Sequence, residues 1–279
     1  MYEGINLTRS SYGFKNVITP SDILAAQPHV FPFRNLNELH SEYEPLPKDP
    51  HTGDNHTAPI RTGLKVDAMF VFDDPRDWAV DIQIVMDLLL SHQGLVGTFS
   101  QRNNDTTLPN NGWQQDGQPT LYFSNGDMIW SSKYHLPRFG QGAFQAALVG
   151  IWRRTTYGQE LKRIVIGKPE RETYRFAEGV MNEHHRVILV NADAPEPKSA
   201  LRAVYMVGDN PDSDIAGANS FKSELGTKWY SALVKTGVWS EKMHGTRVLT
   251  GMKKPTVIVD DVRAAVAWAC GENGWTFDY

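Results

Sequence analysis

The stretch AVYMVGDNPDSDI at residues 203–215 decides the fold. Its first five residues form an apolar run typical of a buried strand, and Gly208 and Asp209 follow that strand directly. Asp212 and Asp214 come within the next five residues, where the next helix is expected to begin. Because ligands of parallel α/β sheets bind outside the carboxyl ends of the strands, this order predicts carboxylates at the open lip of such a sheet.

Apolar segments continue on both sides of this stretch, with helical patterns between them. We predict strands over 163–167, 187–190, 203–207, 230–234 and 256–259, a helix through Tyr174 after the first strand, and a final helix over 262–270. Strands that alternate with helices predict a mainly parallel sheet with right-handed crossovers. The expected fold class is therefore α/β.

The part of the chain before residue 163 is less regular. We predict a brief strand over 13–19, a short helix capped by residues 20–22, and a strand over 66–72 that is buried on both faces. A helix capped by Asp73 and Asp74, with Pro75 at its first position, then leads to a strand over 95–99. Short strands over 120–123 and 128–130 flank a turn at Asn125-Gly126, and another helix begins near Ala143.

Composition excludes several classes of protein. The 279 residues are 41% hydrophobic and 22% charged, which is typical of a globular chain with a substantial buried core. A net charge of -4 gives no basic surface for nucleic acid, and no apolar run approaches the ~20 residues of a membrane span. Cys270 is the single cysteine, so neither an internal disulfide nor a cysteine-based metal site is expected.

The acids of residues 209–214 are the first candidates for chemistry. Hard carboxylate oxygens in such a cluster suit Mg²⁺ better than zinc. A structural role is the alternative, because an aspartate after a strand often forms a turn and Asp212 or Ser213 could cap a helix. Three acids behind one glycine, all within seven residues, favour the site.

Three basic side chains are further candidates. Lys168 follows the predicted strand 163–167, and a lysine at that edge of the sheet can neutralise a phosphoryl group. The alternative is an ordinary solvated lysine. Arg138 and His135 lie in a polar loop, where they could contact a substrate anion or be solvated. We rank Lys168 first because it and the acids are expected at the same sheet edge.

A resemblance to a known family begins with these residues. Gly167-Lys168-Pro169-Glu170, followed by Val207-Gly208-Asp209 and by Asp214-Ile215, resembles motifs III and IV of the haloacid-dehalogenase-like (HAD-like) hydrolases, subclass IIA. Further strings resemble the branch of the cat eye syndrome critical region protein 5 type, at residues 74–78, 81–83, 137–144, 212–219 and 259–262. The similar strings are spread over nearly the whole chain.

The resemblance implies a HAD-like Rossmann-type core with an inserted α/β cap of the C2 type. It divides the chain into a residual N-terminal core segment and connector over 1–63, a cap over 64–162 and the C-terminal half of the core over 163–279. It implies phosphoryl transfer to an aspartate of a D-x-D motif with the help of Mg²⁺. It assigns catalysis to Lys168, metal binding to Asp209 and Asp214, and substrate binding to Asp212, beside the candidates Arg138 and His135.

One part of the family pattern is missing. No D-x-D-G motif follows an apolar strand anywhere in the sequence, and the motif II Ser or Thr is missing too. We therefore expect a core that is incomplete at the N-terminus, through gene truncation, a misplaced start codon or a partial gene model. A phosphatase-type hydrolase of this kind would be inactive as the chain stands. The alternative is a non-catalytic binding or structural protein on the same fold.

The resemblance also bears on partners and location. It implies a small phosphorylated metabolite as substrate, is compatible with a homo-oligomer, and implies a mitochondrial protein. A cytoplasmic protein is the alternative, because the first 19 residues show no presequence pattern. A dinucleotide-binding interpretation of Gly140-Gln141-Gly142 is weak, because Gln145 stands where the third glycine belongs.

Overall fold

The chain forms two compact units. The computed structural model describes residues 13–33, 43, 45–46, 64–192, 194–195, 200–240 and 248–277. Unit 1 comprises Met1–Tyr122 with Ala146–Ile164, and unit 2 comprises Phe123–Gln145 with Val165–Tyr279. The polypeptide therefore passes between the units after residues 122, 145 and 164.

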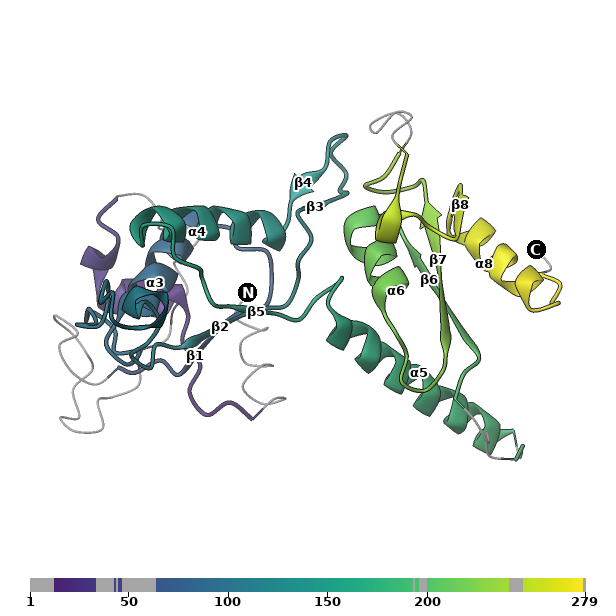
Figure 1. The fold of residues 1–279 in the computed structure, drawn as a ribbon, viewed down its shortest axis with the longest axis horizontal. Coiled ribbons are helices and arrows are strands. Elements are labelled where there is room, and N and C mark those ends of the chain that lie inside the picture. Colours follow the sequence, from purple (N-terminus) through teal and green to yellow (C-terminus); the bar gives the residue numbers. More distant parts are fainter. Residues whose placement is uncertain are drawn as a thin grey trace. The chain divides into compact units, whose positions relative to one another are not determined.

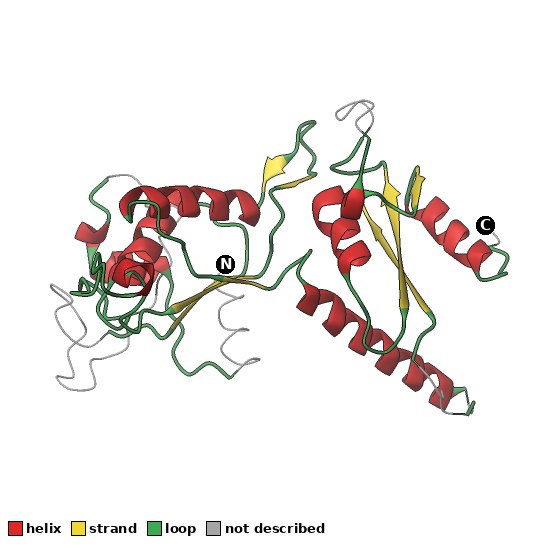
Figure 2. Cartoon of the chain, in the orientation of Figure 1, coloured by secondary structure: helices red, strands yellow, loops and turns green. Residues whose placement is uncertain are grey.

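Unit 2 is built on a three-stranded parallel sheet with the order β6-β7-β8 (Figure 2). The strands are β6 (Ala203–Gly208), β7 (Lys228–Val234) and β8 (Val257–Val259). β6 pairs with β7 from Ala203 opposite Lys228 to Gly208 opposite Leu233. The α/β prediction is confirmed, and the carboxyl ends of β6 and β7 lie side by side.

Helices cover both faces of this sheet (Figure 1). They are α5 (Arg171–Asn191), α6 (Ala216–Ser220) and α8 (Val262–Glu272). On one face, Tyr174 of α5 and Ala218 of α6 pack with Trp229 of β7. On the other face, Ala265 of α8 packs with Ala232 of β7. Side chains alternate between the faces of a strand, so a single strand supplies both halves of this core.

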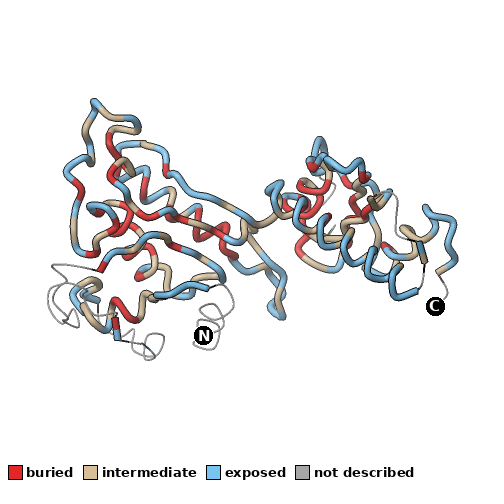
Figure 3. Tube along the Cα trace, turned by 90° about the horizontal axis from the view of Figure 1, so that it is seen from below, coloured by how far each residue is buried: buried red, intermediate tan, exposed pale blue. Residues whose placement is uncertain are grey.

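Unit 1 contains a second three-stranded sheet, with the order β1-β2-β5. Its elements are α2 (Pro20–Ala26), β1 (Ala68–Val71), α3 (Trp78–Leu90), β2 (Thr120–Phe123), α4 (Gln141–Thr155) and β5 (Ile164–Val165), of which β2, α4 and β5 continue into unit 2. Leu89, Leu121, Leu148 and Trp152 are fully buried, and Figure 3 marks the buried positions along the trace. Trp113 meets Trp152 edge to face with ring centroids 6.2 Å apart.

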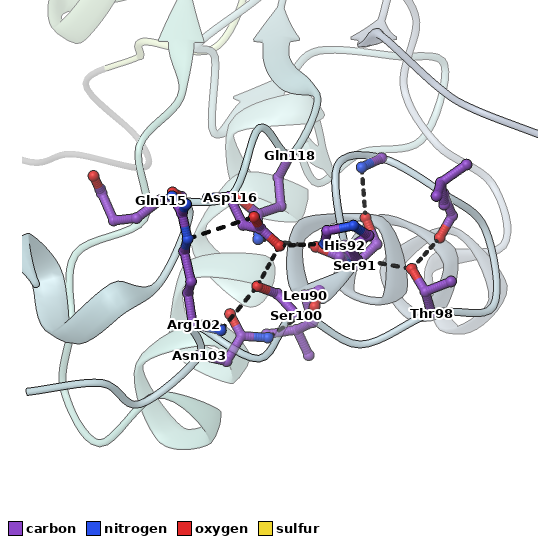
Figure 4. Close-up of polar contacts among 12 residues, drawn as sticks. Leu90, Ser91, His92, Thr98, Ser100, Arg102, Asn103, Gln115, Asp116 and Gln118 are labelled. Carbon is purple, nitrogen blue, oxygen red and sulfur yellow. Dashed lines mark hydrogen bonds and ion pairs between the residues drawn. The ribbon is translucent and has the colours of Figure 1, made fainter.

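A buried carboxylate organises the long loop between α3 and β2 (Figure 4). Asp116 is 7% exposed; its Oδ2 accepts a hydrogen bond of 2.6 Å from the Ser100 hydroxyl and lies 2.7 Å from His92 Nδ1. Arg102 Nε lies 3.6 Å from the other oxygen. Burial by itself raises the pKa of Asp116, but the hydrogen bonds from Ser100 and His92 and the charges of His92 and Arg102 hold the pKa below its ordinary value.

The helix starts follow side-chain caps, not all of them at the predicted residues. Thr19 and Asp22 form a capping box at α2, with Asp22 Oδ2 accepting the Thr19 amide hydrogen bond at 2.7 Å. The predicted cap of α3 at residues 73–74 is wrong. Asp77 caps that helix by accepting from the Val80 amide at 3.3 Å. The acid nearest the first turn can reach its amide groups, whereas the earlier pair belongs to the preceding loop.

Several predicted strands of unit 1 are wrong. Residues 13–19 and 95–99 form no strand, and the second of these segments consists of turns with Gly94 and Gly97 at positive φ. The strand predicted over 66–72 is shorter and covers Ala68–Val71. It is not buried on both faces, because Phe70 is 40% exposed. Apolar content alone suggested these strands, but glycine at left-handed φ ends the extended backbone.

Two further predictions fail around α5. Residues 187–190 are helical, because α5 continues to Asn191, and Val190 is 53% exposed. The β-branched residues there favoured a strand, but an intact helical hydrogen-bond ladder outweighs that weak preference. The strand predicted over 163–167 covers only Ile164–Val165 and belongs to the β1-β2-β5 sheet, not to the β6-β7-β8 sheet. α5 itself begins after Glu170.

Short elements complete the description. They are the helical turns at Pro28–Val30, Pro109–Gly112, Pro211–Ile215 and Gly251–Lys253, and the antiparallel pair β3 (Ile129–Trp130) and β4 (Arg138–Phe139). The predicted hairpin between β2 and residues 128–130 is wrong, because β3 pairs with β4 instead. Within the described residues, no helix combines the length and the apolar character that crossing a membrane requires.

The Asp116 cluster gives a prediction for stability. Asp116→Asn removes the charge but keeps the shape, and it should lower the free energy of unfolding by about 1–3 kcal/mol at pH 7, because the buried Ser100 hydroxyl loses a charged acceptor and His92 and Arg102 lose the charge of their partner. Since the folded pKa is depressed, the wild-type advantage should be present above about pH 4 and shrink as the pH falls below it. Urea unfolding at several pH values measures both effects. Glu160→Gln, an exposed acid of the same unit, is the control and should change little.

Candidate functional site

A lysine and an aspartate meet at the carboxyl end of β6. Lys168 Nζ donates to Asp214 Oδ1 at 2.5 Å, although the two residues are 46 positions apart in the sequence. The Asp214 side chain is 4% exposed and that of Lys168 is 35% exposed. The charge of the aspartate is therefore buried against the ammonium group, while part of the lysine stays open to solvent.

The backbone of the acid loop holds Asp214 in place. Its Oδ2 accepts hydrogen bonds from the amides of Asp209 at 3.1 Å and Asn210 at 3.0 Å. Gly208 makes this possible, because a Cβ there would lie 2.3 Å from the Asp214 carboxyl group. Both oxygens of the carboxylate are thus engaged, one by the lysine and one by its own loop, and the side chain has one orientation.

Tyr174 of α5 holds the same loop through a hydrogen bond. Its hydroxyl donates to the carbonyl of Ser213 at 3.0 Å. Gly217 leaves room for the ring, since a Cβ at that position would lie 2.0 Å from the hydroxyl oxygen. Burial, with the nearby charges of Asp214 and Asp127, raises the pKa of Tyr174, so the hydroxyl remains a proton donor.

A second carboxylate, which sequence reasoning missed, faces Lys168. Asp127 Oδ2 lies 3.7 Å from Lys168 Nζ, and Asp127 Oδ1 accepts a hydrogen bond of 3.3 Å from the side-chain amide of Asn210, Nδ2. Its side chain is 17% exposed. The only signal in the sequence was an acid directly after Asn125-Gly126, and that dipeptide was interpreted as a hairpin turn.

The segment around Asn125 is held by the start of α4. The Asn125 amide donates to Gln141 Oε1 at 3.0 Å, and Gln145 Nε2 donates to the Asn125 carbonyl at 2.7 Å. The Gly142 amide donates to the Asp127 carbonyl at 2.8 Å, and a Cβ at Gly142 would lie 2.3 Å from the Gly126 carbonyl oxygen. Gly142 thus serves backbone packing, which leaves the dinucleotide interpretation without its phosphate-binding loop.

The surrounding charges keep Lys168 protonated. Burial by itself lowers the pKa of Lys168, but the carboxylates of Asp214, Asp127 and Asp209 outweigh it. The pKa is therefore raised above its ordinary value. A permanent ammonium group with one exposed side can neutralise the charge of an incoming anion.

Asp209 lies next to this pair but is held by a different loop. Its Oδ2 accepts a hydrogen bond of 2.6 Å from the Val238 amide, which follows β7. A Cβ at Gly237 would lie 1.8 Å from that oxygen, so the loop approaches the carboxylate closely. Asp209 and Asp214 therefore both follow β6, but Asp209 is held by the segment after β7 and Asp214 by its own loop.

The carboxylate oxygens of Asp209 and Asp214 are the type of ligand that a hard divalent cation prefers. Mg²⁺ is usually held by one or two carboxylates, with water and substrate phosphate completing the octahedron. Asp209 and Asp214 can supply that number of carboxylates. Among the described residues, no group of three or more His, Cys, Asp or Glu side chains forms a complete metal cage.

The three remaining sequence candidates have other partners. Asp212 forms an ion pair with Lys253. Arg138 places its guanidinium 4.6 Å from the centroid of the Tyr134 ring, and the His135 ring lies 4.4 Å from the same centroid with the two planes tilted by 46°. None of the contacts of the described residues joins these three side chains to Lys168 or Asp214.

Comparison with known proteins now decides the family. A family model described as HAD-hydrolase-like matches residues 165–265, which include Lys168, Asp209 and Asp214. Over 269 residues the chain is 35% identical to a mitochondrial hydrolase of Saccharomyces cerevisiae, a match that covers 91% of this chain and 66% of the yeast protein. The chain belongs to the HAD-like hydrolases.

This HAD-like hydrolase has further matches. It is 35% identical over 233 residues to a cardiolipin synthase (CMP-forming)/mitochondrial hydrolase fusion protein of Schizosaccharomyces pombe, covering 83% of this chain and 33% of that protein. It is 21% identical to a glycerol phosphate phosphatase of Mycobacterium tuberculosis solved in complex with magnesium, with a TM-score of 0.33 and coverages of 72% and 53%. The HAD-like hydrolase chain thus spans 66% and 33% of the lengths of the two yeast relatives.

The close contact at Gly208 gives a second prediction. Gly208→Ala should displace the Asp214 carboxylate from Lys168 and lower the free energy of unfolding by about 1–3 kcal/mol, because a Cβ cannot fit at 2.3 Å. Gly179→Ala is the matched control. It lies in α5, where an added Cβ would have no atom within 4 Å, and it should stabilise the protein by about 0.5–1 kcal/mol. Chemical unfolding of both variants tests this, and equal effects would contradict the packing argument.

Proposed function

We propose that this chain supplies the motif III and motif IV part of a Mg²⁺-dependent phosphoric-ester hydrolase of HAD subclass IIA. The observation that carries the proposal is the Lys168–Asp214 pair at the carboxyl end of β6, with Asp209 beside it. Strand ends of this kind are where open α/β sheets bind ligands. The proposed substrate is a small phosphorylated metabolite.

Lys168 has the role of charge compensation in this proposal. The transferred phosphoryl group carries negative charge on its peripheral oxygens, and a fixed cation stabilises that charge in the transition state. Asp214 accepts one of the three N–H donors of the ammonium group, and the side chain remains partly exposed. Asp214 therefore orients the lysine, while the remaining N–H groups of the ammonium stay available to a substrate oxygen.

Asp209 and Asp214 would hold the Mg²⁺ ion. When bound, the ion polarises a phosphoryl oxygen and offsets the charge between the reacting groups. The hydrogen bond from the Val238 amide fixes Asp209 as the ligand, and Asp214, whose two oxygens already accept N–H donors, acts as its supporting acid by holding the loop that carries Asp209. This prearrangement supports the metal assignment.

The remaining parts of the proposal come from the family. Residues 64–162 would form the C2-type cap, and the names of both yeast relatives support a mitochondrial protein. The covalent step requires an aspartate nucleophile in a D-x-D-G motif, which these 279 residues do not contain. We therefore infer that this chain by itself does not turn over phosphate esters. We assign no substrate contact to Asp212, Arg138 or His135.

A chimera tests the function. In the mitochondrial hydrolase of Saccharomyces cerevisiae, the segment that matches this chain is replaced by the chain. Hydrolysis of p-nitrophenyl phosphate by the chimera is measured with and without Mg²⁺. We expect Mg²⁺-dependent turnover from the chimera and only the background rate from the 279-residue chain. Lys168→Met in the chimera should lower kcat by about 10²–10³-fold, because a preoriented charge is lost. Lys235→Met, of equal 35% side-chain exposure, is the control and should have little effect.

Two outcomes would contradict the proposal. A folded chimera without Mg²⁺-dependent hydrolysis, beside an active yeast parent, would favour a non-catalytic binding protein. Mg²⁺-dependent turnover by the 279-residue chain would refute the inferred inactivity. If the chimera does not fold, binding of inorganic phosphate to the full chain, followed by ³¹P NMR, replaces the assay. Lys168→Met should then abolish the binding, whereas Lys235→Met should not.

A further inference from the structure

We propose that Asp127 is a positioning residue for Lys168, an inference that rests on the proposed function because it concerns the same lysine. Asp127 lies outside residues 165–265, the range that the family model matches. It reaches the lysine from the segment that follows β2. The role is therefore additional to the motif III and motif IV residues.

The two oxygens of Asp127 connect two different segments. Oδ2 lies 3.7 Å from Lys168 Nζ, and Oδ1 accepts from Asn210 Nδ2 at 3.3 Å. Asn210 in turn accepts the Asp212 amide hydrogen bond at 3.0 Å and donates its own amide to Asp214. One carboxylate thus links the lysine to the loop that holds its main partner.

A single carboxylate does not fix a lysine ammonium. The side chain has four rotatable methylene groups, and an ion pair with one partner leaves it free to swing around that partner. Two carboxylates from different segments lie near the Lys168 ammonium, Asp214 at 2.5 Å and Asp127 at 3.7 Å. With both charges present, the ammonium has a narrower range of positions, and the N–H donors that Asp214 does not use are left for an incoming anion.

The backbone of Asp127 is itself anchored. Its amide donates to Asn125 Oδ1 at 2.9 Å, and its carbonyl accepts from the Gly142 amide at 2.8 Å. The Gln145 side chain, which is 6% exposed, holds Asn125 from the first turns of α4. The position of the carboxylate therefore follows from the start of α4, so Asp127 can set the position of a flexible partner.

Selective acylation of lysines tests the role in the full chain. A water-soluble N-hydroxysuccinimide ester is applied at one fixed pH, and labelling of Lys168 is quantified by mass spectrometry relative to Lys235. Lys235 is a matched reference, because it has the same 35% side-chain exposure and its own ion pair with Asp260 at 3.0 Å. We expect Asp127→Asn and Asp127→Ala to raise the Lys168/Lys235 ratio by about threefold or more, since the ammonium loses a restraining partner.

Three further variants make the result specific. Asp127→Glu keeps the charge and should restore part of the wild-type ratio. Glu224→Gln removes an exposed acid of the same unit that pairs with Arg171, and it should leave the ratio unchanged. Asn210→Ser keeps a capping side chain for the Asp212 amide but releases Asp127, so it should raise the ratio even if the Asp127 variants fail to fold.

Two results would overturn the inference. One is an unchanged ratio in folded Asp127→Asn, or in Asn210→Ser where the first variant does not fold. The other is an equal rise in the labelling of Lys168 and Lys235, which would mean general loosening of the structure. The labelling needs no turnover, so either result rejects the role of Asp127 and leaves the proposed hydrolase to be judged by the chimera.

Discussion

The hydrogen bond between Lys168 and Asp214 is the interaction on which the proposed site depends. A carboxylate that is almost fully buried needs a partner of opposite charge, because an unpaired charge removed from water costs much free energy. The lysine supplies that charge, and the amides of Asp209 and Asn210 satisfy the second oxygen. The loop, the lysine and Asp127 therefore form one polar network, in which each group has a partner that fixes it.

The network also explains why unit 2 has glycine and an aromatic hydroxyl near the strand ends. Gly208 and Gly217 admit the Asp214 carboxylate and the Tyr174 ring at distances that any side chain would block. The Tyr174 ring, on α5, packs against α6 and β7, and its hydroxyl donates to the carbonyl of Ser213 in the loop. The apolar core and the polar site thus share a residue, and packing of the core positions the charged groups above it.

Sequence reasoning reached the local parts of this arrangement. The strand followed by Gly208 and Asp209 was predictable, because apolar run, glycine and acid are adjacent in the chain. Asp127 was not, since its role depends on contacts with Lys168 and Asn210, 41 and 83 positions away. α5 shows a different limit: the strand predicted at its end failed because β-propensity is weak against a continuous helix.

The way the acid loop binds its own carboxylate constrains its length. Asp214 accepts amides from residues four and five positions earlier, and its other oxygen must still face Lys168. An insertion or deletion of one residue between Gly208 and Asp214 would rotate the carboxylate away from one of these partners. Natural variation in this protein should therefore replace side chains in the loop but preserve its residue count.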